Sequence, residues 1–109
     1  MVSYFISYRG SSPDREAFLR HYAERHAPLL AQFPCICSLD MHTGIEWRDP
    51  FQVNPAGRLL LAQMSFDSIE ALNAALASEA RARAREDFAS FPAFDGVVTH
   101  QAMLSRRMF

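Results

Sequence analysis

The stretch that decides the fold is Ser12–Pro34, SPDREAFLRHYAERHAPLLAQFP, which has the pattern of one long amphipathic helix. Ser12 suits the cap and Pro13 the first helical position, and acidic residues follow near the positive helix end. Charged residues of alternating sign, four positions apart, form one face. The opposite face is apolar at helical spacing. Its members are Phe18, Leu19, Tyr22, Leu29, Leu30 and Phe33.

One histidine falls inside this apolar stripe. His26 follows Tyr22 by four residues and Phe18 by eight, so the three side chains share a helix face. A buried imidazole needs either a hydrogen-bond partner or a role in proton transfer. Burial lowers the pKa of histidine and leaves a neutral ring that can accept a proton near neutral pH. We predict a general acid or base; a core histidine bonded to a backbone carbonyl is the alternative.

Composition predicts one globular domain over residues 1–109. Half of the residues are hydrophobic and the net charge is −1, which is ordinary for a folded domain. The balanced charge and dispersed arginines argue against nucleic acid. No apolar run is long enough to span a membrane, and the opening residues do not resemble a signal peptide. We therefore expect a cytoplasmic protein that binds neither nucleic acid nor a membrane.

No residue spacing predicts a metal site. Cys35 and Cys37 are one residue apart, and neither they nor the four histidines show zinc-site spacing. We expect two reduced core cysteines. All 11 basic residues are arginine, which excludes Schiff-base chemistry. No glycine-rich dinucleotide motif follows a strand. We expect no cofactor, while haem or flavin stays open.

The rest of the chain predicts four strands and a second helical region. Alternating or apolar patterns predict strands over 2–8, 35–45, 58–66 and 97–108. A loop over 46–57 separates the middle two strands. Asp67 suits the cap of a second helix, and Ser78 can start a further helical piece. Arg81, Arg83 and Arg85 step by two and fan around that piece.

The predicted order β-α-β-β-α-β is typical of an α+β, ferredoxin-like fold, an antiparallel sheet with helices on one face. The other face of the sheet is not convincingly polar, because Phe5, Leu59, Leu61 and Met103 fall on it. A sheet with two apolar faces needs a second cover, which a two-fold dimer would supply. We therefore expect a homodimer.

Three segments resemble those of a known family: the opening strand, AFLRHYAERHAPLLAQFP with H-A-P-L at His26–Leu29, and EDFASF around Asp87. They are similar to the EthD family of the dimeric α+β barrel superfamily. The resemblance implies that two sheets close a barrel and that each subunit has a small-molecule pocket. It also implies kinship with cofactor-independent isomerases, dehydratases, decarboxylases and monooxygenases. In lactone methylisomerases a histidine matching His26 serves catalysis beside a tyrosine, where this chain has Leu39.

Two further side chains are candidates for catalysis. Tyr8 ends the first strand and His100 lies midway along the last, and these strands are neighbours in the expected fold. Both could point to the helix-covered face, where Tyr8 could donate a hydrogen bond to a substrate oxygen. Ordinary packing with a satisfied polar tip is the alternative for each.

The remaining candidates would bind substrate. Asp87 could orient a histidine, or could cap a helix or pair with Arg83, and we expect His21 at the surface. Aromatic residues on the long loop favour a lid or a partner contact, with packing onto the body as the alternative. The substrate-binding candidates are Tyr22, Leu39, Met41, Trp47, Phe51 and Asp87.

These observations predict a small homodimeric enzyme that acts on an apolar or aromatic organic molecule. His26 would move a proton during isomerisation, elimination or cofactor-free oxidation. Two alternatives belong to other classes. The first is a non-catalytic protein that binds a small ligand. The second is a haem-binding protein in which His26 or His100 holds the iron.

Overall fold

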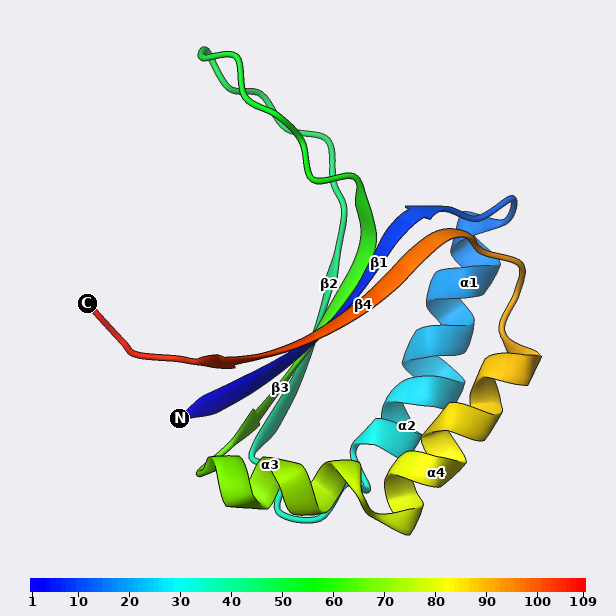
Figure 1. The fold of residues 1–109 in the computed structure, drawn as a ribbon. Helices are drawn as coiled ribbons and strands as arrows, with labels where there is room; N and C mark the ends of the chain where they lie inside the picture. The colour runs from blue at the N-terminus through cyan, green and yellow to red at the C-terminus, as the bar shows by residue number, and fades with distance from the viewer.

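Four antiparallel strands form one sheet in the order β2-β3-β1-β4 in the computed structural model, which describes residues 1–109 (Figure 1). The long inner strand β1 pairs with β3 on one side and with β4 on the other. This order confirms the predicted ferredoxin-like fold. The strands are β1 (Val2–Ser11), β2 (Ser38–Thr43), β3 (Arg58–Phe66) and β4 (Asp95–Leu104).

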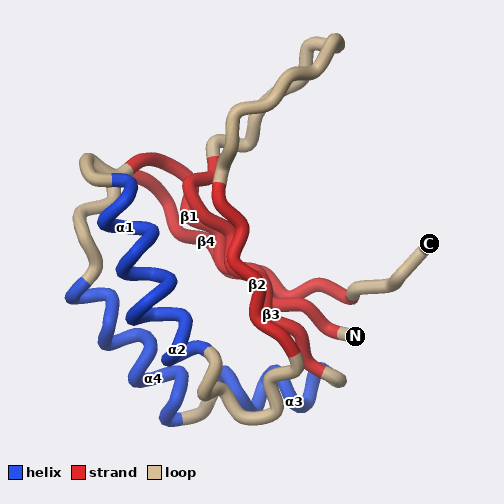
Figure 2. The backbone as a smooth tube through the Cα atoms, turned by 180° about the vertical axis from the view of Figure 1, so that it is seen from behind, coloured by secondary structure: helices blue, strands red, loops and turns tan.

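The helices all cover one face of the sheet (Figure 2). The first helical run consists of α1 (Arg15–His21), a π-helical segment η1 (Tyr22–His26) and α2 (Ala27–Leu30). The second run consists of α3 (Ile69–Leu76), α4 (Glu79–Glu86) and a 3₁₀ turn η2 (Asp87–Ser90). None of these helices has the length and apolar character needed to cross a membrane.

Two helix caps differ from the sequence-based prediction. Asp14, not Ser12, caps α1 by accepting a hydrogen bond from the backbone N–H of Ala17. Ser12 instead donates to the carbonyl of Ala93, which ties the start of the helix to the chain before β4. Ser68, one residue beyond the predicted Asp67, caps α3. Asp67 and Ser68 both have short polar side chains that can cap a helix, and the backbone conformation at Ser68 makes it the cap. Ser78 caps α4 as predicted.

The core lies between the sheet and the helices. The even-numbered side chains of β1 and β3 point to the helices, as the period of two requires. Burying each large apolar side chain there contributes roughly 1.5–3 kcal/mol relative to leaving it exposed. The largest fully buried apolar and aromatic members of this core include Tyr8, Phe18, Tyr22, Leu60, Met64, Phe66 and Leu72.

The other face of the sheet has no helix over it. Phe5, Leu61 and Met103 line a shallow hollow on this face, as the alternation predicts. The prediction that Leu59 also lies on this open face was wrong, because Leu59 is buried in the core. A register shift opposite Tyr8 and Arg9 moves Leu59 out of the alternation, and Arg58 lines the open hollow instead.

Two cysteines predicted for the core are exposed. Cys35 and Cys37 are free thiols in the turn that precedes β2, and Cys35 has a positive φ of 61°. The predicted second strand began at residue 35, but the strand starts at Ser38. The left-handed backbone at Cys35 cannot continue a strand, so the sequence up to Cys37 turns before the sheet begins.

Candidate active site

A hydrogen-bonded pair of side chains joins the two helical runs. His26 ends the π-helical segment η1 and is 2% exposed. Its Nδ1 atom lies 3.0 Å from Oδ2 of Asp87, the first residue of η2. An ionised carboxylate can only accept a hydrogen bond, so Nδ1 carries the proton in this pair. In the neutral ring Nε2 is then the free base, and it makes no hydrogen bond with the protein.

A second histidine reaches the same carboxylate oxygen. Nε2 of His21 lies 3.0 Å from Oδ2 of Asp87, and the His21 side chain is only 16% exposed. The prediction of a surface position for His21 was wrong. In a regular α-helix, residues five apart point about 140° away from each other. The π-helical segment between the two histidines has wider turns, with Ala27 N–H bonded to Tyr22 O, so both rings can face Asp87.

Burial and the hydrogen bonds between them determine the ionisation states of His26 and Asp87 at neutral pH. Burial lowers the pKa of His26 below 6.5, although its hydrogen bond to Asp87 opposes that shift. Burial also pushes the pKa of Asp87 upward, but the hydrogen bonds from His21 and His26 outweigh it, and the net pKa lies below 3.8. Asp87 is therefore a carboxylate and His26 a neutral imidazole at pH 7.

Aromatic rings enclose the His26 imidazole. Tyr22 and Phe91 lie at centroid distances of 4.9 and 4.8 Å from it, and Phe88 lies at 5.5 Å. Tyr8 packs behind them, edge-on to Tyr22 at 5.7 Å. The hydroxyl groups of Tyr8 and Tyr22 are buried without any hydrogen-bond partner. Burial raises the pKa of both phenols, so each remains a protonated donor.

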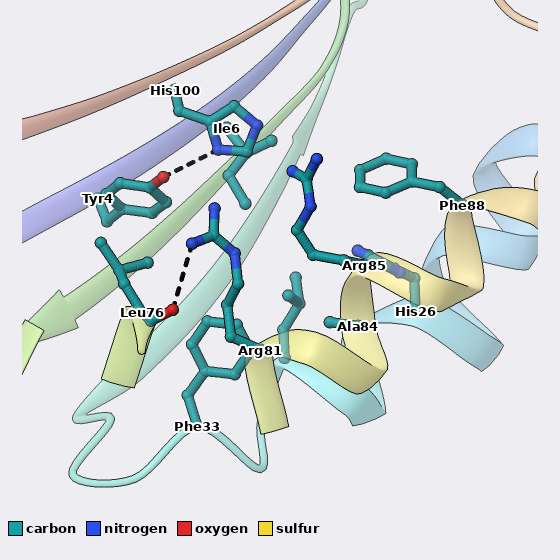
Figure 3. A pocket seen from close by; sticks show the side chains of 11 residues that line it. Tyr4, Ile6, His26, Phe33, Leu76, Arg81, Ala84, Arg85, Phe88 and His100 are labelled. Carbon is teal, nitrogen blue, oxygen red and sulfur yellow. Dashed lines mark hydrogen bonds between the residues drawn. The ribbon is translucent and has the colours of Figure 1, made fainter. Parts of the chain in front are cut away.

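A hollow opens beside His26 between the sheet and the second helical run (Figure 3). The empty space between its walls is about 290 Å³, including some open solvent, but the centre of a water molecule can reach only about 20 Å³ of it. That is room for about one water. The hydroxyl of Tyr4 lies 2.9 Å from Nδ1 of His100 at one wall. The lining residues are Tyr4, Ile6, His26, Leu30, Phe33, Leu76, Arg81, Ala84, Arg85, Phe88 and His100.

The family model of the EthD domain matches residues 12–95. The chain belongs to the EthD family. The matched region contains both histidines of the shared hydrogen-bond system and Asp87. No curated protein matches the chain in sequence.

Solved structures share the EthD chain's fold at low sequence identity. An EthD family protein from Bacillus halodurans C-125 is 20% identical over 97% of this chain and 100% of its own, with a TM-score of 0.75. A monooxygenase from Streptomyces coelicolor, in complex with nanaomycin D, is 14% identical over 99% and 89%, with a TM-score of 0.68. The cofactor-independent oxygenase SnoaB from Streptomyces nogalater is 15% identical over 98% and 94%, with a TM-score of 0.63.

The structure brings some of the predicted site residues of this EthD chain together and separates others. His26 and His100 line the hollow, and Asp87 holds His26 from behind. Tyr8 and Tyr22 lie in the aromatic layer next to His26 without lining the hollow. The expectation that Asp87 could orient a histidine matches the observed contact, whereas Arg83 pairs with Glu79 instead.

Four predicted substrate-binding residues lie elsewhere. Leu39 and Met41 face the helices from β2, which is separated from β1 and β4 by β3, and they do not line the hollow. Trp47 and Phe51 are 58% and 79% exposed on an extended arm, residues 44–57 between β2 and β3, that stands away from the sheet and helices (Figure 1). In a single chain these aromatic side chains therefore do not cover the hollow.

Sequence reasoning missed four residues of the site. Tyr4 gave no signal beyond its place on a half-buried strand. His21 became recognisable only through the π-helical segment. Arg81 and Arg85 did carry a signal, because residues four apart on a helix share one face. No three His, Cys, Asp or Glu side chains lie close enough together to hold a metal ion.

Proposed function

We propose that this EthD protein is a cofactor-independent enzyme in which His26 removes a proton from a small aromatic or apolar organic molecule. The observation that carries the proposal is the unpaired Nε2 of a buried, neutral His26 whose ring lines a hollow. The hydrogen bond to Asp87 sets the tautomer and would stabilise the imidazolium formed when the proton arrives. This arrangement suits a general base better than a passive core residue.

Isomerisation, elimination and cofactor-free oxidation can all begin with removal of a proton from the substrate. The resulting carbanion or phenolate can be protonated at another carbon, can expel a leaving group, or can react with dioxygen. We favour the last course, because similar folds occur in a monooxygenase and in a cofactor-independent oxygenase. The common first step is what the His26 geometry supports.

His100 and Tyr8 have supporting roles in this proposal. His100 lines the hollow and is held by Tyr4, so it can bind a substrate oxygen. Tyr8 is a buried hydroxyl donor without a partner, and it becomes useful once a ligand parts the aromatic layer. Tyr22, Leu39, Met41, Trp47 and Phe51 stay candidate substrate contacts, the last two through closure of the arm over a site.

We also propose that the protein is a homodimer. Every residue of β4 is exposed, and the open sheet face carries apolar side chains such as Phe5 and Met103. The extended arm adds exposed Ile45, Trp47 and Phe51. Burying the open faces of two sheets against each other would remove this apolar surface from water.

Hydrogen–deuterium exchange tests the proton transfer directly. Small aromatic ketones and hydroquinones are incubated in D₂O, and loss of the acidic C–H signal is followed by NMR together with oxygen uptake. The wild-type protein should accelerate exchange of at least one probe, and His26→Ala should abolish that acceleration while the protein remains folded. His42→Ala is a matched control, because His42 is exposed on β2 and contacts Gln63. Ligand binding without any exchange would favour a non-catalytic binding protein.

A further inference from the structure

Two guanidinium groups face the hollow from one helix. Arg81 and Arg85 are four residues apart on α4, which places them on the same side of the helix. Both line the hollow, and Figure 3 shows their side chains extending from α4 toward the strands that carry Tyr4 and His100. Arg83, between them, turns outward and pairs with Glu79 at 3.9 Å.

Arg81 is half-buried and Arg85 is exposed, and neither arginine has a carboxylate partner. The ion pairs of the chain are His21–Asp87, His26–Asp87 and Arg83–Glu79. Arg81 donates one hydrogen bond, from Nη1 to the carbonyl of Leu76 at 3.3 Å. The guanidinium carbon of Arg85 lies 5.6 Å from the centre of the Phe88 ring. Most of the N–H donors of both groups are therefore free.

The groups around the hollow favour a negative charge inside it. Its lining contains no Asp or Glu, and Asp87 touches it only through His26. Burial and then the charges of Arg81 and Arg85 lower the pKa of His100, so this ring stays neutral while the guanidinium groups remain charged. The lining therefore holds two cations beside an apolar wall and no anion, which favours an anionic ligand.

We propose that Arg81 and Arg85 bind the carboxylate of the substrate, so that this site selects small aromatic or apolar carboxylic acids. Planar guanidinium groups match a carboxylate with paired hydrogen bonds. The apolar part of the acid would then lie against Leu30, Phe88 and His26. This inference rests on the proposed function for the location of the site, and it adds the substrate class.

The free volume in the hollow is small, about 20 Å³ for the centre of a water molecule. Room for about one water cannot hold an aromatic acid, so entry requires a wall to move. Arg81 and Arg85 are the long, flexible side chains of the wall, and no ion pair restrains them. An incoming carboxylate would draw both guanidinium groups to itself, which opens the space that they now fill.

Matched ligand pairs test the assignment. Phenylacetate and phenylacetamide have nearly the same shape and differ in charge, as do benzoate and benzamide. Binding to the wild-type protein, Arg81→Gln, Arg85→Gln and the double variant is measured by ligand-observed NMR and calorimetry. The acids should bind at least about tenfold tighter than the amides, and the double variant should lose this preference. Arg83→Gln is the control and should keep it.

Three results would overturn the proposal. The first is equal binding of acid and amide, including no binding of either. The second is a carboxylate preference that survives in the double variant. The third is binding of inorganic phosphate as tight as that of phenylacetate, which would reveal an unselective anion site. His26→Gln separates this inference from the proposed function: it should abolish proton exchange and retain the carboxylate preference.

Discussion

The imidazole of His26 and the carboxylate of Asp87 are joined by a 3.0 Å hydrogen bond between Nδ1 and Oδ2, although the two residues are 61 positions apart in the chain. The bond ties the end of the π-helical segment η1 to the start of η2. Through it, the orientation of a buried imidazole ring is set by a residue from a distant segment of the chain.

Replacing the carboxylate should weaken proton transfer without unfolding the protein. Asp87→Asn removes the negative charge that stabilises a protonated His26, so the pKa of His26 should fall further. We expect the rate of proton exchange to drop about 100-fold. Glu79→Gln removes an exposed carboxylate of the neighbouring helix and should leave the rate unchanged. An Asp87→Asn protein with wild-type rate would show that the contact does not support the base.

Lowering the pH should reduce both stability and activity. The pKa of His26 lies below 6.5 in the folded protein, so between that pKa and 6.5 the unfolded chain binds a proton that the folded protein does not. Stability is therefore fully present above pH 6.5 and is lost as pH falls toward the folded pKa. The pKa of His100 is also lowered, so His100 makes stability fall with decreasing pH in the same way. Activity falls in the same direction, because a protonated His26 is no longer a base.

Melting temperatures and exchange rates across this pH range check that prediction. His26→Gln has no titrating group at this position, so its stability should depend less steeply on pH than that of the wild type. Part of the slope should remain because His100 still titrates. Equal slopes in the two proteins would contradict the buried, neutral state of His26.

His21 should act as a positioning residue for the pair. His21→Ala removes one of the two donors at Oδ2, so the pKa of Asp87 should rise toward its usual value. Loss of one such hydrogen bond should slow proton exchange about fivefold. His21→Gln keeps an N–H donor and should restore part of the rate. NMR titration of the Asp87 carboxyl group measures the pKa, and no change in it would refute the role.

The buried hydroxyl of Tyr22 should be a cost to stability. It has no hydrogen-bond partner, and burying such a group without one is unfavourable by about 1–3 kcal/mol. Tyr22→Phe should therefore increase the free energy of unfolding, by about 1 kcal/mol, in chemical denaturation. A decrease would show that the hydroxyl is satisfied by ordered water. Reduced activity in a stabilised variant would assign the hydroxyl to the substrate.

The open sheet face should carry the homodimer contact. Met103→Glu places a charge among Phe5, Leu61 and Thr99, where two sheets would meet, so the dimer should dissociate. Sedimentation velocity measures the change. Ala23→Glu introduces the same charge on the exposed side of the first helical run and should leave the assembly intact. A dimer that survives Met103→Glu would place the interface elsewhere, with the extended arm as the next region to test.

Local patterns in the sequence determined the elements and their order. An apolar run predicted β3 with its observed bounds, and the apolar stripe of Ser12–Pro34 placed Phe18, Tyr22 and His26 on the buried face. These patterns work because each depends on residues within a few positions of one another. The antiparallel order of the sheet followed from the order of the elements and the known preferences of short connections.

Only the tertiary structure decided what His26 contacts. The meeting of His26 with Asp87 depends on how the second helical run packs against the first, and no local pattern encodes that distance. The π-helical segment that turns His21 inward is equally invisible, because it adds one residue to a turn without changing the apolar pattern. Arg81 and Arg85 line one hollow together with His100 because tertiary packing brings α4 and β4 to the same place. Sequence periodicity specifies which side of a helix is buried, whereas packing between distant segments specifies its neighbours.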